Sequence, residues 1–208
     1  MIIAEVVTLA KYSELSGVSV KDNVDAIVAF MNLGMLELHS RFNIKVEEHI
    51  VELQDESTLY TMPSNFMYAT DAFGEAPENA INQVIPIPIN SEDSPISIFF
   101  NSWNKLQVPR SVEGGYISIV YIAKPDTISV QQAQDGSTEL DLPDTLIECL
   151  LSYIGYRAHL GVKSDGQSEN NAHLARFERN CIKARELGVA FPADSMSMSS
   201  RINDRGFA

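Results

Sequence analysis

The fold of this chain is indicated by residues 24–53, VDAIVAFMNLGMLELHSRFNIKVEEHIVEL, in which the spacing of apolar side chains changes part-way along. The first part has apolar residues at the i, i+3, i+4, i+7 spacing of an amphipathic helix, namely Val24, Ile27, Val28, Met31, Met35 and Leu38. Past Arg41-Phe42-Asn43, residues 45–53 approach the alternation of a strand. The stretch therefore predicts a long helix that leads directly into β structure.

Gly34 lies in the middle of this predicted helix. Glycine inside a helix costs about 1 kcal/mol relative to alanine, so Gly34 indicates either a close helix crossing or a tolerated weakness. Before the long helix, residues 4–15 predict a shorter one. Ser19 is the expected N-cap of the helix that follows.

The middle of the chain is rich in strand signals. Residues 45–53 and 58–62 are separated by an acidic turn and predict a hairpin or meander. Further strand-like segments predict a small antiparallel sheet or sandwich, and they lie at residues 66–72, 81–89, 96–100 and 116–123. Because Pro86, Pro88 and Pro95 have no N–H to donate, the stretch that contains them is expected to be an edge strand or an extended loop.

Helical signals return at Leu142-Pro143-Asp144, where proline suits the first helical turn and aspartate favours its positive end. An apolar stripe follows at Leu146, Ile147, Leu150, Leu151, Ile154 and Ala158. A last helix is expected to bury Leu174, Phe177, Cys181 and Ala184 on one face and to end near Gly188. From residue 193 the chain is too small and polar to form a core, so it predicts a tail.

The order of helices, strands and helices predicts an α+β fold. We expect a helical bundle built from residues 1–44 and 143–188, formed by both ends of the chain. Residues 45–142 are expected to form an inserted antiparallel β domain, and residues 189–208 an extended C-terminal tail.

The charge of the chain is strongly negative. The 208 residues include 15 Lys and Arg against 28 Asp and Glu, which gives a formal net charge of −13. The excess lies entirely in residues 1–142, because residues 143–208 carry eight basic and eight acidic side chains. Such a surface repels duplex DNA and anionic lipid. A role of the whole surface in wrapping nucleic acid or binding a membrane is therefore disfavoured.

Signals for targeting and for disulfides are weak. Residues 1–5 carry no basic group and are followed by no long apolar run, so we expect no signal peptide and no membrane span. Cys149 and Cys181 are the only cysteines and neither belongs to a CxxC pair. They are expected to be free, buried thiols in a reducing compartment, and a zinc site is not indicated.

Catalytic motifs are not found. The sequence has no nucleophile elbow, zinc-protease motif or phosphate-binding glycine loop. His39, His49, His159 and His173 have no His or Cys partner at helical spacing, so they are interpreted as isolated. Glu47 and Glu48 are adjacent on a predicted strand, point to opposite faces and are interpreted as solvated edge charges. We expect no enzymatic activity, no catalytic residue, no cofactor and no metal.

Two groups of residues are candidates for contact with a partner. Arg176, Arg179 and Lys183 form a basic stripe that can dock on an acidic protein or touch phosphate, unless it is only a solvated helix face. Trp103 is either an exposed aromatic anchor for a partner or a structural aromatic of the sheet.

The sequence also resembles a known family, the head-to-tail connector adaptors of short-tailed bacteriophages, called tail tubular protein A. The resemblance begins with residues 34–43, GMLELHSRFN, which close the N-terminal helical segment, and with the acidic strand pair that ends in residues 59–63, LYTMP. It continues through a variable β-rich insertion to Leu142-Pro143, an arginine-bearing helix and an extended tail. It covers nearly the whole chain.

The resemblance implies a structural protein of the virion, made in the host cytoplasm. About a dozen copies would form a dodecameric ring between the portal protein and the tail nozzle, with helices side by side around a channel. The tail residues Arg201, Ile202, Arg205 and Phe207 would dock on the portal, and the β part would contact the nozzle or the tail fibres. DNA would pass through the acidic ring during ejection without specific binding.

Other functions stay open at the level of sequence. The chain is alternatively another neck, tail or capsid-accessory binding protein of α+β fold without a portal-docking tail. A third reading is a cell-wall hydrolase carried by the tail, which would require converging carboxylates that the sequence does not indicate.

Overall fold

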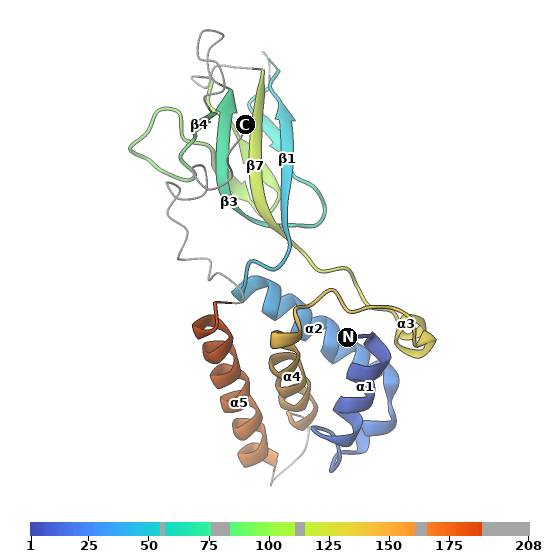
Figure 1. Ribbon diagram of the computed structural model, residues 1–208. Helices are drawn as coiled ribbons and strands as arrows, with labels where there is room; N and C mark the ends of the chain where they lie inside the picture. Colours follow the sequence, from blue (N-terminus) through green and yellow to red (C-terminus); the bar gives the residue numbers. More distant parts are fainter. Residues whose placement is uncertain (55–56, 76–83, 111–114, 161–165, 189–208) are drawn as a thin grey trace. The chain divides into compact units, whose positions relative to one another are not determined.

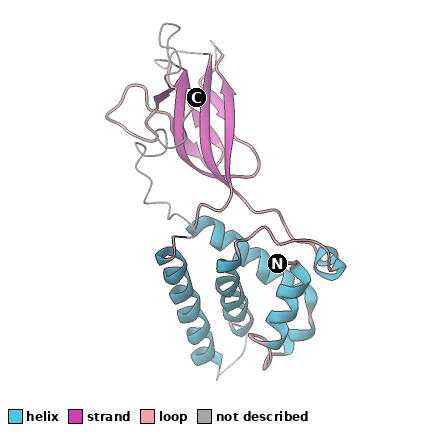
Figure 2. Ribbon diagram, viewed as in Figure 1, coloured by secondary structure: helices cyan, strands magenta, loops and turns pink. Residues whose placement is uncertain are grey.

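The computed structural model describes residues 1–54, 57–75, 84–110, 115–160 and 166–188, and it divides into two compact units (Figure 1). The helical unit is made by Met1–Ile44 and by the described residues from Pro125 to Gly188. The β unit is made by Lys45–Lys124. Helices and strands are thus segregated, as Figure 2 shows, and the predicted α+β fold is confirmed.

The helical unit contains five α-helices among the described residues. They are α1 (Ile3–Tyr12), α2 (Val24–Arg41), α3 (Val130–Asp135), α4 (Ile147–His159) and α5 (Gly166–Glu186), with 3-10 turns η1 (Ser19–Asp22) and η2 (Asp144–Leu146). Figure 1 shows α4 between α1 and α5, and α4 packs on both of them and on α2. The N-cap of α2 is Asn23, whose side chain accepts the N–H of Ala26, and not Ser19, which begins η1.

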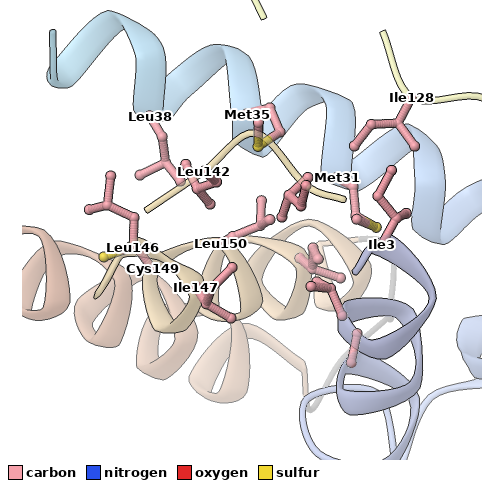
Figure 3. Packing of buried hydrophobic residues seen from close by; sticks show 14 of the residues in the cluster. Ile3, Met31, Met35, Leu38, Ile128, Leu142, Leu146, Ile147, Cys149 and Leu150 are labelled. Carbon is pink, nitrogen blue, oxygen red and sulfur yellow. The ribbon is translucent and has the colours of Figure 1, made fainter. Parts of the chain in front are cut away.

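The core of this unit gathers side chains from both ends of the chain. In Figure 3, Met31, Met35 and Leu38 of α2 lie over Ile147 and Leu150 of α4. The predicted apolar stripes are therefore confirmed as the packing faces. Burial of one such side chain contributes roughly 1.5–3 kcal/mol, so this core is the main stabilising feature of the unit.

The helical unit takes more of the chain than the sequence indicates. Residues 125–142, which the sequence pattern groups with the β insertion, pack in the helical core through Ile128, Ala133, Leu140 and Leu142. The Leu140 N–H also donates to the Met1 carbonyl, which ties this segment to the start of α1. The boundary between the units accordingly lies at Lys124.

Among the described residues, the β unit contains two antiparallel sheets. One has the order β1 (Val46–Glu52), β7 (Tyr116–Ala123), β3 (Phe66–Glu75) and β4 (Val84–Pro86). The other has the order β2 (Leu59–Thr61), β6 (Lys105–Gln107) and β5 (Phe99–Ser102). Val51, Ile117 and Ile119 of the first sheet share one core with Leu106 of the second, which agrees with the predicted sandwich.

One pairing differs from the sequence expectation. β1 and β2 are not a hairpin or meander, because β1 pairs with β7 and β2 pairs with β6. The register Val46↔Ile122 to Glu52↔Tyr116 joins the first strand of the unit to its last. The predicted edge position of the proline-bearing stretch is confirmed, since β4 ends at Pro86 on the edge of its sheet.

Candidate functional site

One face of helix α5 packs in the helical core, and a basic face of the same helix is exposed. Phe177, Cys181 and Ala184 are buried in the helical core, as the sequence predicts. Arg179 and Lys183 lie on the exposed side, and Ile182 between them is 53% exposed. A pair of cations beside an apolar side chain is a combination suited to contact with an acidic partner.

Arg176, the third residue of the stripe, has an intramolecular partner. Its Nη1 donates to Glu14 Oε1 at 2.8 Å. Glu14 lies in the segment after α1, so this ion pair links two parts of the helical unit. The accessible cations of the stripe are therefore chiefly Arg179 and Lys183.

A cleft of about 190 Å³ opens beside this basic face, where α5 meets the start of α4. Its lining includes Asp144 and Glu148 from the α4 side and Lys183 and Leu187 from the α5 side. Leu187 is exposed at the C-terminal end of α5. Charges of both signs beside an apolar group can bind a short polar segment of another chain.

Arg41 joins the end of α2 to α5. Its Nε donates to Glu37 Oε1 at 2.6 Å and its Nη1 to Glu178 Oε2 at 2.7 Å. The guanidinium also lies over the ring of Phe177, 4.7 Å from the centroid. The hydrogen bond with Glu178 raises the pKa of Arg41, and the same bond lowers the pKa of the Glu178 carboxyl. This arrangement is a structural link between two helices.

Trp103 lies in the turn between β5 and β6 and is 61% exposed. The ammonium group of Lys124 lies 5.0 Å from the centre of its ring. Lys105 follows closely in the chain and its Nζ donates to the Thr61 hydroxyl at 2.6 Å. Trp103 is thus an exposed aromatic next to cations and is not buried in the sheet.

The two adjacent glutamates of β1 have different environments. Glu47 Oε2 accepts hydrogen bonds from the Tyr121 hydroxyl and from Asn65 Nδ2, both at 2.8 Å, so this edge charge, 35% exposed, also has partners that the sequence did not indicate. The bond from Tyr121 lowers the pKa of Glu47, while burial raises the pKa of Tyr121 to about 12. Glu48 contacts Ser118 on the adjacent strand. A carboxyl with a lowered pKa is poorly suited to act as a general acid.

Cys149 and Cys181 are confirmed as free and buried. They are neighbours across the α4–α5 contact, and the interaction with Cys181, followed by burial, raises the pKa of the Cys149 thiol. A thiol with a raised pKa is a weak nucleophile at neutral pH. Among the residues that the structure describes, no three His, Cys, Asp or Glu side chains are arranged to hold a metal ion.

Comparison with protein families decides the class of this chain. The model of the SU10 adaptor protein family matches residues 2–201. The chain belongs to the SU10 adaptor protein family. This match is to the phage adaptors as a group and not to tail tubular protein A in particular. A comparison with curated proteins finds no match.

The adaptor is a structural component of a phage virion and interacts with other virion proteins. Of its described helices, none combines the length and apolar character that a membrane span needs. The four residues assigned to portal docking, Arg201, Ile202, Arg205 and Phe207, lie outside the described residues. The described candidates for partner contact are the basic face of α5, in the helical unit, and Trp103, in the β unit.

Sequence reasoning missed one polar cluster of the adaptor. His159 and His173, interpreted as isolated, have stacked rings with centroids 4.7 Å apart, and Glu14 contacts His173. Glu14 is more than 140 positions from either histidine in the sequence. No local spacing signal can reveal such a cluster, because the fold brings together the segment after α1, the end of α4 and helix α5.

Proposed function

We propose that this adaptor is a non-enzymatic head-to-tail connector. Copies of the chain form a ring between the portal and the tail nozzle or fibres, and DNA passes through the ring during ejection. The observation that carries the proposal is the adaptor family match over residues 2–201. The exposed cations of α5, on a chain with a net charge of −13, add support because they suit docking on a protein surface.

The surfaces have separate roles in this proposal. The C-terminal residues Arg201, Ile202, Arg205 and Phe207 dock on the portal, and the basic face of α5 contributes to the same contact. Trp103 anchors the β unit on the nozzle or the fibres, since a large exposed aromatic is a frequent hot spot of binding. The acidic residues of the first 142 positions repel DNA and keep it from adhering to the channel.

Absence of catalysis is part of the proposal. Three of the described carboxylates make structural contacts: Glu47 binds Tyr121, Glu178 binds Arg41 and Glu14 binds Arg176. A cell-wall turbidity assay tests this part directly. Clearing of cell walls by the purified chain, and not by buffer or heat-denatured chain, would contradict it.

The decisive experiment mixes the purified full chain with a portal ring and images the product by electron microscopy. We expect a symmetric collar of the chain on the portal. A variant that lacks residues 193–208 is expected to bind the portal at least about tenfold more weakly, because the deletion removes Arg201 and Arg205 together with the apolar Ile202 and Phe207. A chain that never binds the portal would contradict the connector role. Binding that is unchanged by the deletion would instead indicate another neck or tail protein.

A further inference from the structure

A nearly buried ionic cluster joins the N-terminal half of α5 to the rest of the helical unit. Its centre is the Glu14 carboxylate, whose side chain is 10% exposed. Glu14 Oε2 lies 2.8 Å from His173 Nδ1, and Oε1 accepts from Arg176 Nη1 at 2.8 Å. One carboxylate outside α5 thus contacts two residues on adjacent turns of that helix.

His159, at the C-terminal end of α4, completes the cluster. Its ring stacks on that of His173 with an interplanar angle of 25°. Its Nε2 lies 3.3 Å from the backbone carbonyl oxygen of Glu14. The His159 residue is 7% exposed and the His173 side chain 15% exposed. Three segments, the one after α1, the end of α4 and the first half of α5, therefore meet at two imidazole rings.

The hydrogen-bond partner of His159 assigns the proton of its neutral ring. The backbone carbonyl of Glu14 can only accept, so the neutral His159 ring carries its proton on Nε2. His173 Nδ1 lies 2.8 Å from Glu14 Oε2, but these two atoms do not have hydrogen-bond geometry. A second proton on the His159 ring adds charge without being needed for its contact with Glu14.

Gly155 of α4 fixes the position of the His173 ring. A Cβ at this position would lie 2.6 Å from His173 Nδ1 and 2.9 Å from Cε1. Such distances are shorter than van der Waals contact, so only glycine allows the ring to lie against α4 at this point. The ring has little space for a shift that would relieve a new charge.

The charges that face His173 from each neighbouring element are those of Glu14, His159 and Arg176. The single negative charge of Glu14 is already shared with Arg176. Protonation of both histidines would therefore leave three cations around one carboxylate, with two of them on stacked rings. Burial lowers the pKa of His173 below its ordinary 6.5, and His159 and Arg176 add to this effect while Glu14 opposes it.

We propose that the Glu14–His159–His173–Arg176 cluster is a pH-sensitive joint that seats the first half of α5 on the bundle above about pH 6.5 and releases it on acidification. The direction of this pH dependence follows because the folded state favours the neutral form of His173. A histidine whose pKa is lowered by folding stabilises the folded state above its unfolded pKa, and this contribution is lost as the pH falls below that value. Acidification therefore weakens the attachment of the helix that carries Arg179 and Lys183.

Amide hydrogen exchange of the full chain at pH 7.5 and 5.5 tests this joint, after correction for the intrinsic pH dependence of exchange. In the wild-type chain we expect the protection of α5 amides to fall severalfold at the lower pH, because the pKa of His173 is lowered in the fold and its protonation then opposes folding. His173→Gln is expected to remove this dependence, because its amide can still donate to Glu14 but does not titrate. His49→Gln, in the β unit, is the matched control and should keep the dependence.

Equal protection of α5 amides at both pH values in the wild-type chain would overturn the proposal. A loss of protection in His173→Gln as large as that in the wild-type chain would also overturn it. If the variant does not fold, titration of the histidine ring resonances of the wild-type chain tests the proposal instead. We expect His173 to titrate below pH 6.5, since burial lowers its pKa. Titration of His173 at or above pH 6.5 would overturn the joint.

Discussion

Gly34 shows how one residue sets the distance between two helices. A Cβ at this position would lie 2.6 Å from Leu150 Cδ1 and 3.1 Å from Tyr153 Cδ1. The backbone of α2 therefore crosses α4 more closely than any other residue would allow, and of the two interpretations of Gly34 the close crossing is confirmed.

Gly34→Val tests this contact. We expect the free energy of unfolding to fall by about 1–3 kcal/mol, because the new side chain overpacks a core that has no room for it. Chemical denaturation followed by circular dichroism measures the change. Ala29→Val, on the exposed side of the same helix, introduces the same β-branched residue without the clash and should have little effect. Equal losses in both variants would mean that helix propensity, and not crowding, is the cause.

Residues whose environment follows from their own helix face were predictable. Cys149 and Cys181 were placed in the core because apolar neighbours surround them at helical spacing. The partners of Glu47 were not predictable, since Asn65 comes from the turn before β3 and Tyr121 from β7. A polar side chain gives no signal for a partner that only the fold supplies.

At the scale of elements, Arg41 determines how the end of α2 is attached to α5. Arg41→Met removes both ion pairs but retains an unbranched side chain over Phe177. The partners are partly exposed, so we expect a loss of about 1 kcal/mol in the free energy of unfolding at pH 7. Arg41→Lys should restore only part of it, since lysine cannot donate to two carboxylates in the same geometry.

The effect of Arg41→Met should depend on pH. The pKa of Glu178 is lowered from its ordinary 4.5, chiefly by the bond from Arg41, so its contribution exists above pH 4.5 and is lost as the pH falls. The difference between wild type and Arg41→Met should therefore shrink as the pH falls below 4.5. Lys21→Met, which removes an exposed cation of η1, is the control and should show no such trend. A difference that stays constant with pH would contradict this role of Glu178.

The outer face of α5 provides a second test at this scale. The double variant Arg179→Glu, Lys183→Glu should fold as well as wild type, because both side chains are exposed. We expect its affinity for a portal ring to fall by at least about tenfold, as charge reversal at a contact replaces attraction by repulsion. Lys21→Glu changes charge elsewhere on the same unit and should bind normally. Unchanged binding of the double variant would show that the basic face of α5 does not contribute to portal docking.

Elements with a strong periodic signal were predicted well. The strand expected at residues 116–123 is β7. Helix α3 was missed because it is only six residues long, although Ser129 and Gln132 form a capping box that marks its start. The proposed hairpin was wrong because a strand pattern defines a strand but not its partner, and here the partner of β1 is about 70 residues away.

At the scale of the molecule, the position of residues 125–142 can be tested through the unfolding of each unit. Leu142→Ala should destabilise the helical unit by about 2–5 kcal/mol, because Leu142 lies in its core. Helical circular dichroism should show the loss. Fluorescence of Trp103, the single tryptophan and a residue of the β unit, should change little.

Ile119→Ala is the reciprocal variant, since Ile119 is fully buried in the core of the β unit. It should shift the unfolding transition seen by Trp103 fluorescence and leave the helical signal nearly unchanged. A shift of the Trp103 transition by Leu142→Ala equal to that of the helical signal would show that residues 125–142 also support the β unit.

The fold class, the faces of the long helices and the lack of known catalytic motifs could be read from the sequence, because each of these depends on local spacing along the chain. The excess of acidic residues also limits the role that DNA can have. The packed fold was needed to show that β1 pairs with β7, that residues 125–142 complete the helical core, and that Glu14 meets His159 and His173. These contacts join residues far apart in the chain, and their energy is available only once the helices and sheets have packed.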